Sequence, residues 1–178
     1  MIWGVNKAGS RSAVRLFLAL WPDAQVREAL VRSREAWVWP AGAALVRPQS
    51  LHLTLHFLGA VPVARLPRLR AGLAVPFQPF TLCLDRAALW PRGVAVLQAE
   101  PSPDGLLALH QALGLALQGL ELPVEQRTLR PHVTLARHAG RALPPVQAQR
   151  ITWPVSGYAL VASMPDLPGR YRLLERYA

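Results

Sequence analysis

Two short segments of this chain, 80 residues apart, have almost the same sequence. The first covers residues 52–55 (HLTL) and the second covers residues 132–135 (HVTL). In a β-strand, side chains at positions i and i+2 point to the same face of the sheet. Each segment therefore presents one imidazole and one hydroxyl side by side, while the residue between them points into a core. A chain of 178 residues with one such strand in each half is constrained to bring two related halves together.

The rest of the chain predicts alternating strands and helices. Pro22 and Asp23 mark the start of one helix, and leucines at helical spacing along one face mark another at 103–120. Gly59 is expected to end the first His-containing strand. We expect helices at 23–36, 63–74 and 103–120, and strands at 14–21, 51–58, 80–87, 94–99, 131–137, 155–163 and 170–177. The order strand–helix–strands occurs twice, which predicts an α+β fold with two similar lobes and a central cleft.

Composition limits the class of protein. Hydrophobic residues make up 52 % of the chain, enough for a packed interior. Residues 1–13 lack periodicity and are expected to be a disordered tail, which leaves 14–178 as a single two-lobed domain. No segment has the length and apolarity of a transmembrane helix, and the N-terminus lacks the pattern of a signal peptide. The single cysteine, Cys83, excludes an internal disulfide, and we expect a cytoplasmic protein.

The chain is strongly basic. Its formal net charge is +10, and Lys7 is its only lysine, so arginine supplies the other basic residues. A GC-rich coding bias would explain the choice of arginine over lysine. The excess of cations over only ten carboxylates instead favours a phosphate-rich partner, because guanidinium groups bind phosphate in bidentate fashion.

The paired motifs carry a definite chemistry. Histidine is the side chain whose ordinary pKa lies nearest neutrality, so one imidazole can accept a proton while the other donates one. Thr54 and Thr134 would donate hydrogen bonds to the non-bridging oxygens of a phosphate, where charge accumulates in the transition state. Two facing pairs could therefore move a phosphoryl group between oxygens without a metal. The residues alone leave open whether His52 or His132 is the acid.

These segments also resemble a known family. Residues 47–59 (RPQSLHLTLHFLG) and 131–137 (PHVTLAR) are similar to the two motifs of the 2H phosphoesterases, specifically the RNA 2′,3′-cyclic phosphodiesterases once called 2′-5′ RNA ligases. Segments 15–20 and 171–174 also lie where that family has similar sequences. The resemblance covers the chain from Val14 to its C-terminus.

The resemblance implies a fold and a reaction. It implies two lobes of antiparallel sheet flanked by helices, with both His–Thr pairs in the cleft between them. It implies hydrolysis of terminal 2′,3′-cyclic phosphates of RNA to 2′-phosphates, with His52 as the proton donor to the leaving 3′ oxygen and His132 as the proton acceptor from water. No metal and no cofactor are implied, and the reverse reaction would join RNA ends through a 2′-5′ bond.

Four neighbouring residues are further candidates. Arg137 matches an arginine that helps to hold phosphate in that family, although strict alternation puts it on the face opposite to Thr134 unless the strand bulges. His56 stands four residues after His52, so alternation puts it on the face of the site as a candidate substrate contact. Phe17 and Tyr171 could stack on a base, with core packing as the alternative for Phe17.

Two other functions stay open. One is a phosphodiesterase that acts on a small cyclic nucleotide or on a 2′-5′ oligonucleotide with the same pocket. The other is a non-catalytic module that binds RNA ends, although such a module has no need of two proton-transfer groups. In each case we expect a monomer whose partner is an RNA end or a small nucleotide and which does not associate with a membrane.

Overall fold

The computed structural model describes residues 13–125, 127–164 and 170–178. The described helices are α1 (Ala24–Glu35), α2 (Leu66–Gly72) and α3 (Asp104–Gly119), with short 3₁₀ turns at Pro48–Ser50 and Val63–Arg65. The described strands are β1 (Ala13–Leu20), β2 (Ala44–Leu45), β3 (Leu53–Pro62), β4 (Phe80–Leu84), β5 (Arg86–Trp90), β6 (Val94–Gln98), β7 (His132–Arg137), β8 (Ile151–Val155), β9 (Tyr158–Ser163) and β10 (Tyr171–Tyr177).

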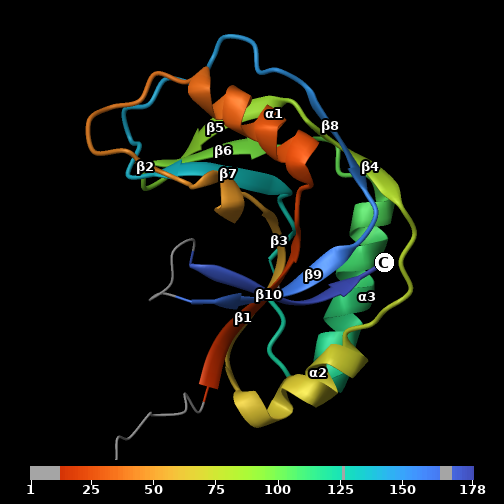
Figure 1. Cartoon of the computed structure of the whole chain (residues 1–178). Coiled ribbons are helices and arrows are strands. Elements are labelled where there is room, and N and C mark those ends of the chain that lie inside the picture. The colour runs from red at the N-terminus through yellow and green to blue at the C-terminus, as the bar shows by residue number, and fades with distance from the viewer. Residues whose placement is uncertain (1–12, 126, 165–169) are drawn as a thin grey trace, which may run out of the picture.

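The main sheet is antiparallel and falls into two lobes. Its order is β10-β9-β1-β3-β7-β6-β5, and the short β2 also pairs with β7. Figure 1 shows β1, β9 and β10 in the lower part of the molecule, and β5, β6 and β7 in the upper part. Each lobe carries one of the two His–Thr segments, one at the start of β3, where His52 directly precedes the strand, and one on β7. The expected α+β fold with two lobes of antiparallel sheet is confirmed.

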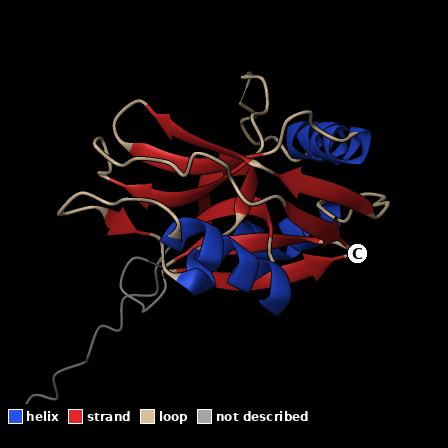
Figure 2. Ribbon diagram, turned by 90° about the horizontal axis from the view of Figure 1, so that it is seen from above, coloured by secondary structure: helices blue, strands red, loops and turns tan. Residues whose placement is uncertain are grey.

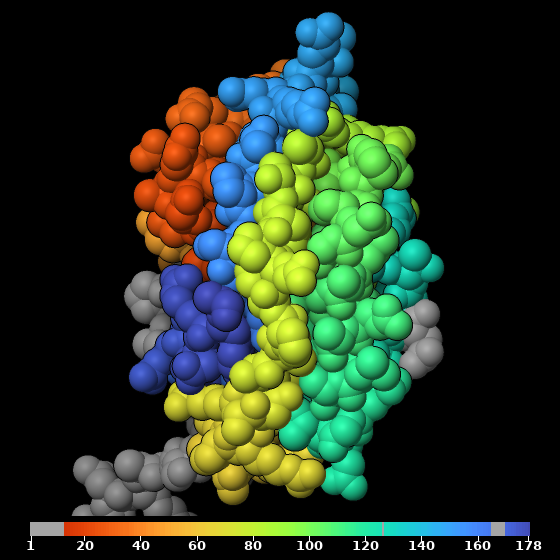
Figure 3. Space-filling model, turned by 90° about the vertical axis from the view of Figure 1, so that its right-hand side faces the viewer, coloured from red at the N-terminus to blue at the C-terminus, as the bar shows by residue number. Residues whose placement is uncertain are grey.

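Helices cover the outer faces of the strands. Seen from above in Figure 2, the helices lie at the periphery of the strands. Figure 3 shows α3 alongside the segment that contains β4, which is paired in a separate two-stranded sheet with β8. The apolar face of α3 provides Leu106, Leu109, Leu113 and Leu117 to the main core. This is the helical face that the leucine spacing predicts.

Local signals in the sequence agree with most element bounds. Asp23 caps α1, since its Oδ1 accepts a hydrogen bond from the backbone N–H of Val26 at 2.8 Å. Gly59 does not end β3 as expected: it adopts a φ of +75°, which glycine tolerates, and the strand continues to Pro62. The predicted strand 80–87 is divided between β4 and β5, which belong to different sheets.

The structure bears only in part on the expected N-terminal tail and on the expected absence of a transmembrane helix. The proposed tail, residues 1–13, lies outside the described residues except for Ala13, which is the first residue of β1. In the part of the chain that the structure describes, no helix is long and apolar enough to span a bilayer.

Candidate functional site

A cavity of about 300 Å³ lies between the two lobes. It is lined by both members of each His–Thr pair and by two arginines, Arg15 and Arg137. Among the described residues, no Asp or Glu lines this cavity. The lining therefore combines two titratable imidazoles, two hydroxyls and positive charge, which suits an anion.

The two histidines are held in the same way. His52 Nδ1 lies 2.6 Å from the backbone carbonyl oxygen of Ser50, and His132 Nδ1 lies 2.6 Å from that of Arg130. In both cases the carbonyl two residues earlier can only accept, so Nδ1 carries the proton and donates it. This tautomer leaves Nε2 of each neutral ring with a free lone pair, which can take a proton from another group.

Burial favours the neutral form of both imidazoles in the free protein. Desolvation lowers the pKa of His52 to about 4, and the positive charges of His132 and Arg137 act in the same direction, against the hydrogen bond to Ser50. Desolvation also lowers the pKa of His132, with smaller contributions from Arg130 and Arg137. A bound anion would reverse these shifts, because a negative charge stabilises an imidazolium ion.

One backbone pairing brings the two motifs together. Leu53 of β3 pairs with Val133 of β7 in antiparallel register. Extending this register by one residue in each direction places His52 across from Thr134, and it places Thr54 across from His132. The two histidines therefore occupy one diagonal of a compact group of four polar side chains.

A bulge in β7 turns Arg137 toward the cavity. Consecutive residues of β6 pair with Thr134 and Ala136, so Leu135 has no partner of its own. An extra residue shifts the alternation of all later side chains by one position. Arg137 therefore lines the same cavity as His132, as the sequence analysis allows where the strand bulges.

A bulge in β3 likewise turns His56 away from the cavity. Consecutive residues of β1 pair with Thr54 and His56, so Leu55 is the bulged residue. His56 is consequently on the core side and only 3 % exposed, whereas Phe57 is 57 % exposed and lines the cavity. The expectation that His56 faces the site is therefore wrong, since strict alternation does not survive a bulge.

His56 instead packs against α3. Its Nε2 donates to the backbone carbonyl of His110 at 2.9 Å, and the two rings stack with centroids 4.0 Å apart. Burial lowers the pKa of both histidines, to about 4 for His110. This pair belongs to the contact between β3 and α3, away from the cavity.

Aromatic side chains surround His52. The ring centroid of Phe17 is 5.0 Å from that of His52, and the ring centroid of Tyr171 is 5.2 Å from it. Both residues line the cavity. Phe17 is buried, so it is at once a core residue and part of the wall. Trp21 stacks on His52 at 5.3 Å with planes 7° apart. Sequence reasoning missed Trp21 and Phe57, although the continued alternation of β1 from Phe17 to Trp21 could have indicated the first.

The donor set does not resemble a metal site. Among the described residues, no three side chains of His, Cys, Asp or Glu gather closely enough to hold a metal ion. The two histidines of the cavity have threonines and arginines as neighbours, and cationic side chains disfavour a bound cation.

Comparisons with known proteins agree with this geometry. The sequence model of the LigT-like phosphoesterase family matches residues 20–96. The RNA 2′,3′-cyclic phosphodiesterase of Thermus thermophilus is 34 % identical over 93 % of this chain and 90 % of its own length. The enzyme of the same name from Escherichia coli K12 is 33 % identical over 92 % of this chain and 96 % of its own length.

Solved structures give the same result. The crystal structure of E. coli LigT in its apo form has a TM-score of 0.83 at 30 % identity, covering 94 % of this chain and 98 % of that one. The structure of E. coli LigT complexed with 3′-AMP also has a TM-score of 0.83, covering 93 % of this chain and 98 % of that one.

Proposed function

This chain belongs to the LigT-like phosphoesterase family, and on that premise we propose that it hydrolyses terminal 2′,3′-cyclic phosphates of RNA to 2′-phosphates. The observation that carries the proposal is the pair of histidines across one cavity. Each has its Nδ1 engaged by a backbone carbonyl, and the described lining holds threonines and arginines but no carboxylate. This arrangement provides two proton-transfer groups around an anion site.

The proposed reaction divides the proton transfers between the histidines. Neutral His132 accepts a proton from water at Nε2 while the water oxygen attacks phosphorus. The bond from phosphorus to the 3′ oxygen breaks, and protonated His52 donates its Nε2 proton to that oxygen. The product keeps its phosphate on the 2′ oxygen. This assignment requires bound phosphate to raise the pKa of His52 from its low value in the empty cavity.

The other polar groups stabilise charge on the phosphate. The hydroxyls of Thr54 and Thr134 would donate hydrogen bonds to the non-bridging oxygens, and Arg137 would provide a charge-assisted pair. We place the terminal base against the aromatic side chains near His52, where Phe17 and Tyr171 line the cavity. The same groups could also join RNA ends if a 5′-hydroxyl replaced water. Its oxygen would attack phosphorus and give its proton to His132, while the bond from phosphorus to the 3′ oxygen breaks and His52 protonates that oxygen, which leaves a 2′-5′ phosphodiester.

The direct test uses purified protein in EDTA with a short RNA that ends in a 2′,3′-cyclic phosphate. The double variant His52→Ala/His132→Ala is run beside it, and the products are separated as 2′- and 3′-monoesters. We expect a 2′-phosphate from the wild type alone. A 3′-phosphate would contradict the assignment of the leaving oxygen, and equal opening by both proteins would exclude the two-histidine mechanism.

The same experiment separates the competing functions. An enzyme for small nucleotides would open a cyclic mononucleotide but not the RNA. A module that only binds RNA ends would leave both intact, and titration of RNA binding would then identify it.

We further propose that the protein acts as a monomer in the cytoplasm. Both lobes that line the cavity come from one chain, so the site needs no residue from a second copy. The lone Cys83 suits a reducing compartment, where no disulfide is needed. Light scattering should give the mass of one chain, 19.6 kDa, and cell fractionation should recover the protein with cytoplasmic markers.

A further inference from the structure

A second aromatic surface lies beyond His132, on the side away from His52. The sheet continues from β7 through β6 to the edge strand β5, of which Trp90 is the last residue. The ring centroid of Trp90 is 4.4 Å from that of His132, with the planes at 52°. Trp90 is not among the residues that line the cavity, so its ring lies outside the cavity while it contacts His132.

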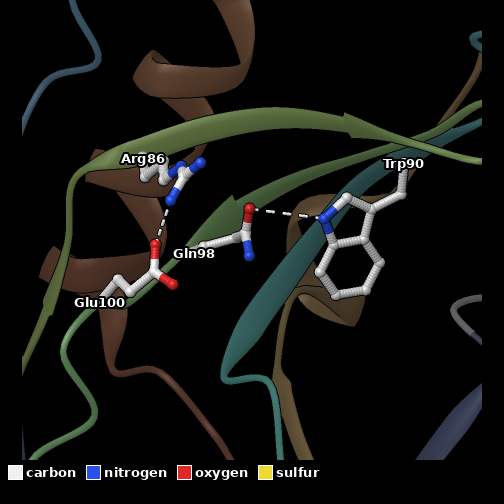
Figure 4. Close-up of polar contacts among 4 residues, drawn as sticks. All are labelled: Arg86, Trp90, Gln98 and Glu100. Carbon is white, nitrogen blue, oxygen red and sulfur yellow. Dashed lines mark hydrogen bonds and ion pairs between the residues drawn. The ribbon is translucent and has the colours of Figure 1, made fainter.

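Trp90 is connected through Gln98 to the pair of strands that positions His132. Its Nε1 donates a hydrogen bond to Oε1 of Gln98 at 3.4 Å, as Figure 4 shows. Gln98 is buried, and its Cα pairs with that of His132 across β6 and β7. In the same view Arg86 points to Glu100, with which it forms an ion pair. The indole ring therefore has a defined place beside the site.

Arg130 lies over this ring. Its guanidinium carbon is 4.5 Å from the Trp90 ring centroid, the geometry of a cation–π contact. The side chain is exposed, and no carboxylate in the described ranges forms an ion pair with it. The backbone carbonyl of the same residue accepts the Nδ1 proton of His132. Arg130 therefore places a guanidinium that has no carboxylate partner among the described residues next to one of the two proton-transfer groups.

We propose that Arg130, held over the ring of Trp90, binds the phosphodiester that precedes the terminal nucleotide, so that the substrate is an RNA chain. This inference rests on the proposed function, because it assumes that the cyclic phosphate lies between the two histidines. A guanidinium over a ring that has no carboxylate partner among the described residues can offer its N–H donors to a ligand, and these donors match two phosphate oxygens. The terminal base then lies on the His52 side, and the chain leaves across β6 and β5.

The substrate comparison that tests this uses four compounds. They are adenosine 2′,3′-cyclic phosphate, the same compound with a 5′-phosphate, the dinucleotide ApA ending in a 2′,3′-cyclic phosphate, and that dinucleotide with an uncharged methylphosphonate linkage. For the wild type, we expect kcat/KM on the charged dinucleotide to exceed that on the mononucleotide by about 10- to 100-fold, the effect of one charged hydrogen-bonded contact. The methylphosphonate should lose that gain. Equal gain from the 5′-phosphate alone would assign the subsite to a phosphate group rather than to an RNA chain.

Variants test whether Arg130 and Trp90 produce the gain in kcat/KM on the charged dinucleotide. Arg130→Ala should abolish the gain on the charged dinucleotide, measured as the ratio of its kcat/KM to that on the mononucleotide. The substitution keeps the backbone carbonyl that holds His132. It should have no further effect on the methylphosphonate, since the interaction is already absent. Trp90→Leu should remove part of the gain, because it frees the guanidinium without deleting it. Arg127→Ala is the matched control, since it removes an exposed arginine of the same segment that is paired with Glu125.

The outcomes distinguish this proposal from the function on which it rests. Wild-type protein that opens the mononucleotide without any gain on the dinucleotide overturns the subsite and leaves the proposed function intact. Equal losses on both substrates in Arg130→Ala, with a displaced pH profile, would make Arg130 a positioning residue for His132 and also overturn the subsite. Wild-type protein that opens none of the four compounds removes the proposed function and the subsite together.

Discussion

Leu53 pairs with Val133 across the junction of the two lobes, and both side chains are fully buried. This pair points into the core, so the residues on either side of it must point into the cavity. The pairing thereby aligns the two His–Thr segments side by side and in opposite directions. The site depends on this register, because a slip of one residue would turn all four polar side chains away from the cavity.

Removal of either histidine should abolish most of the activity. We expect His52→Ala and His132→Ala each to lower kcat by roughly 100-fold or more, the scale of general acid–base catalysis. Single-turnover measurements on RNA with a 2′,3′-cyclic phosphate end would give the rate of the chemical step. Wild-type turnover by either folded variant would contradict the role of the pair.

The threonines should matter less than the histidines. Thr54→Ala or Thr134→Ala removes one hydrogen bond to a charged oxygen, so we expect a loss of about 1.5–3 kcal/mol in transition-state stabilisation. The comparison of kcat/KM for Thr→Ala and Thr→Ser variants isolates the hydroxyl. If the serine variants lost as much activity as the alanine variants, the effect would come from packing of the methyl group instead.

Arg137 should act through bidentate contact as well as charge. Arg137→Lys keeps the positive charge but removes the planar fork, so we expect kcat/KM between those of the wild type and Arg137→Ala. Because Arg137 lies on the cavity side only through the bulge at Leu135, it should contribute despite its odd spacing from Thr134. Unchanged kinetics of Arg137→Ala would show that the bulge does not bring this guanidinium to the phosphate.

Binding of an anion should take up a proton. The pKa of His52 is about 4 in the empty cavity, and a phosphodiester in contact with it would raise that value. Affinity should therefore increase as pH falls from 8 toward 5, by at most about tenfold per pH unit for each proton bound. Calorimetry with a deoxydinucleotide, whose single phosphodiester stays monoanionic, in buffers of different ionisation enthalpy would count the protons. A pH-independent affinity would show that bound phosphate leaves the histidines neutral.

The stacked pair of buried His56 and half-buried His110 should make the fold sensitive to acid. Both pKa values lie below the ordinary value of 6.5, so the unfolded chain binds protons more readily than the folded one. Their contribution to the free energy of unfolding is complete above pH 6.5 and decreases as pH falls toward about 4. Urea unfolding at pH 7.5 and pH 5 should give a smaller loss for His110→Gln, which cannot titrate. The same loss as in the wild type would assign the acid sensitivity to other groups.

The sequence by itself determined most of the helices and strands and the chemical groups of the site. The buried face of α3 follows from leucines at helical spacing, and the capped start of α1 follows from Asp23. The two His–Thr pairs follow from a repeat that is visible without any structure, because alternation over three residues depends only on the extended backbone. That a face with two imidazoles and two hydroxyls would surround an anion was predictable from the same residues.

Only the tertiary structure decided which further side chains join them. The bulges at Leu55 and Leu135 arise where each strand pairs with its neighbour, and no local pattern in β3 or β7 reveals them. They bring Phe57 and Arg137 into the cavity, and they move His56 into the core. The contacts of Trp21 with His52, and of Trp90 with His132, likewise join residues distant in the chain. Side-chain alternation is a property of one strand, whereas register and bulges are properties of a pair of strands.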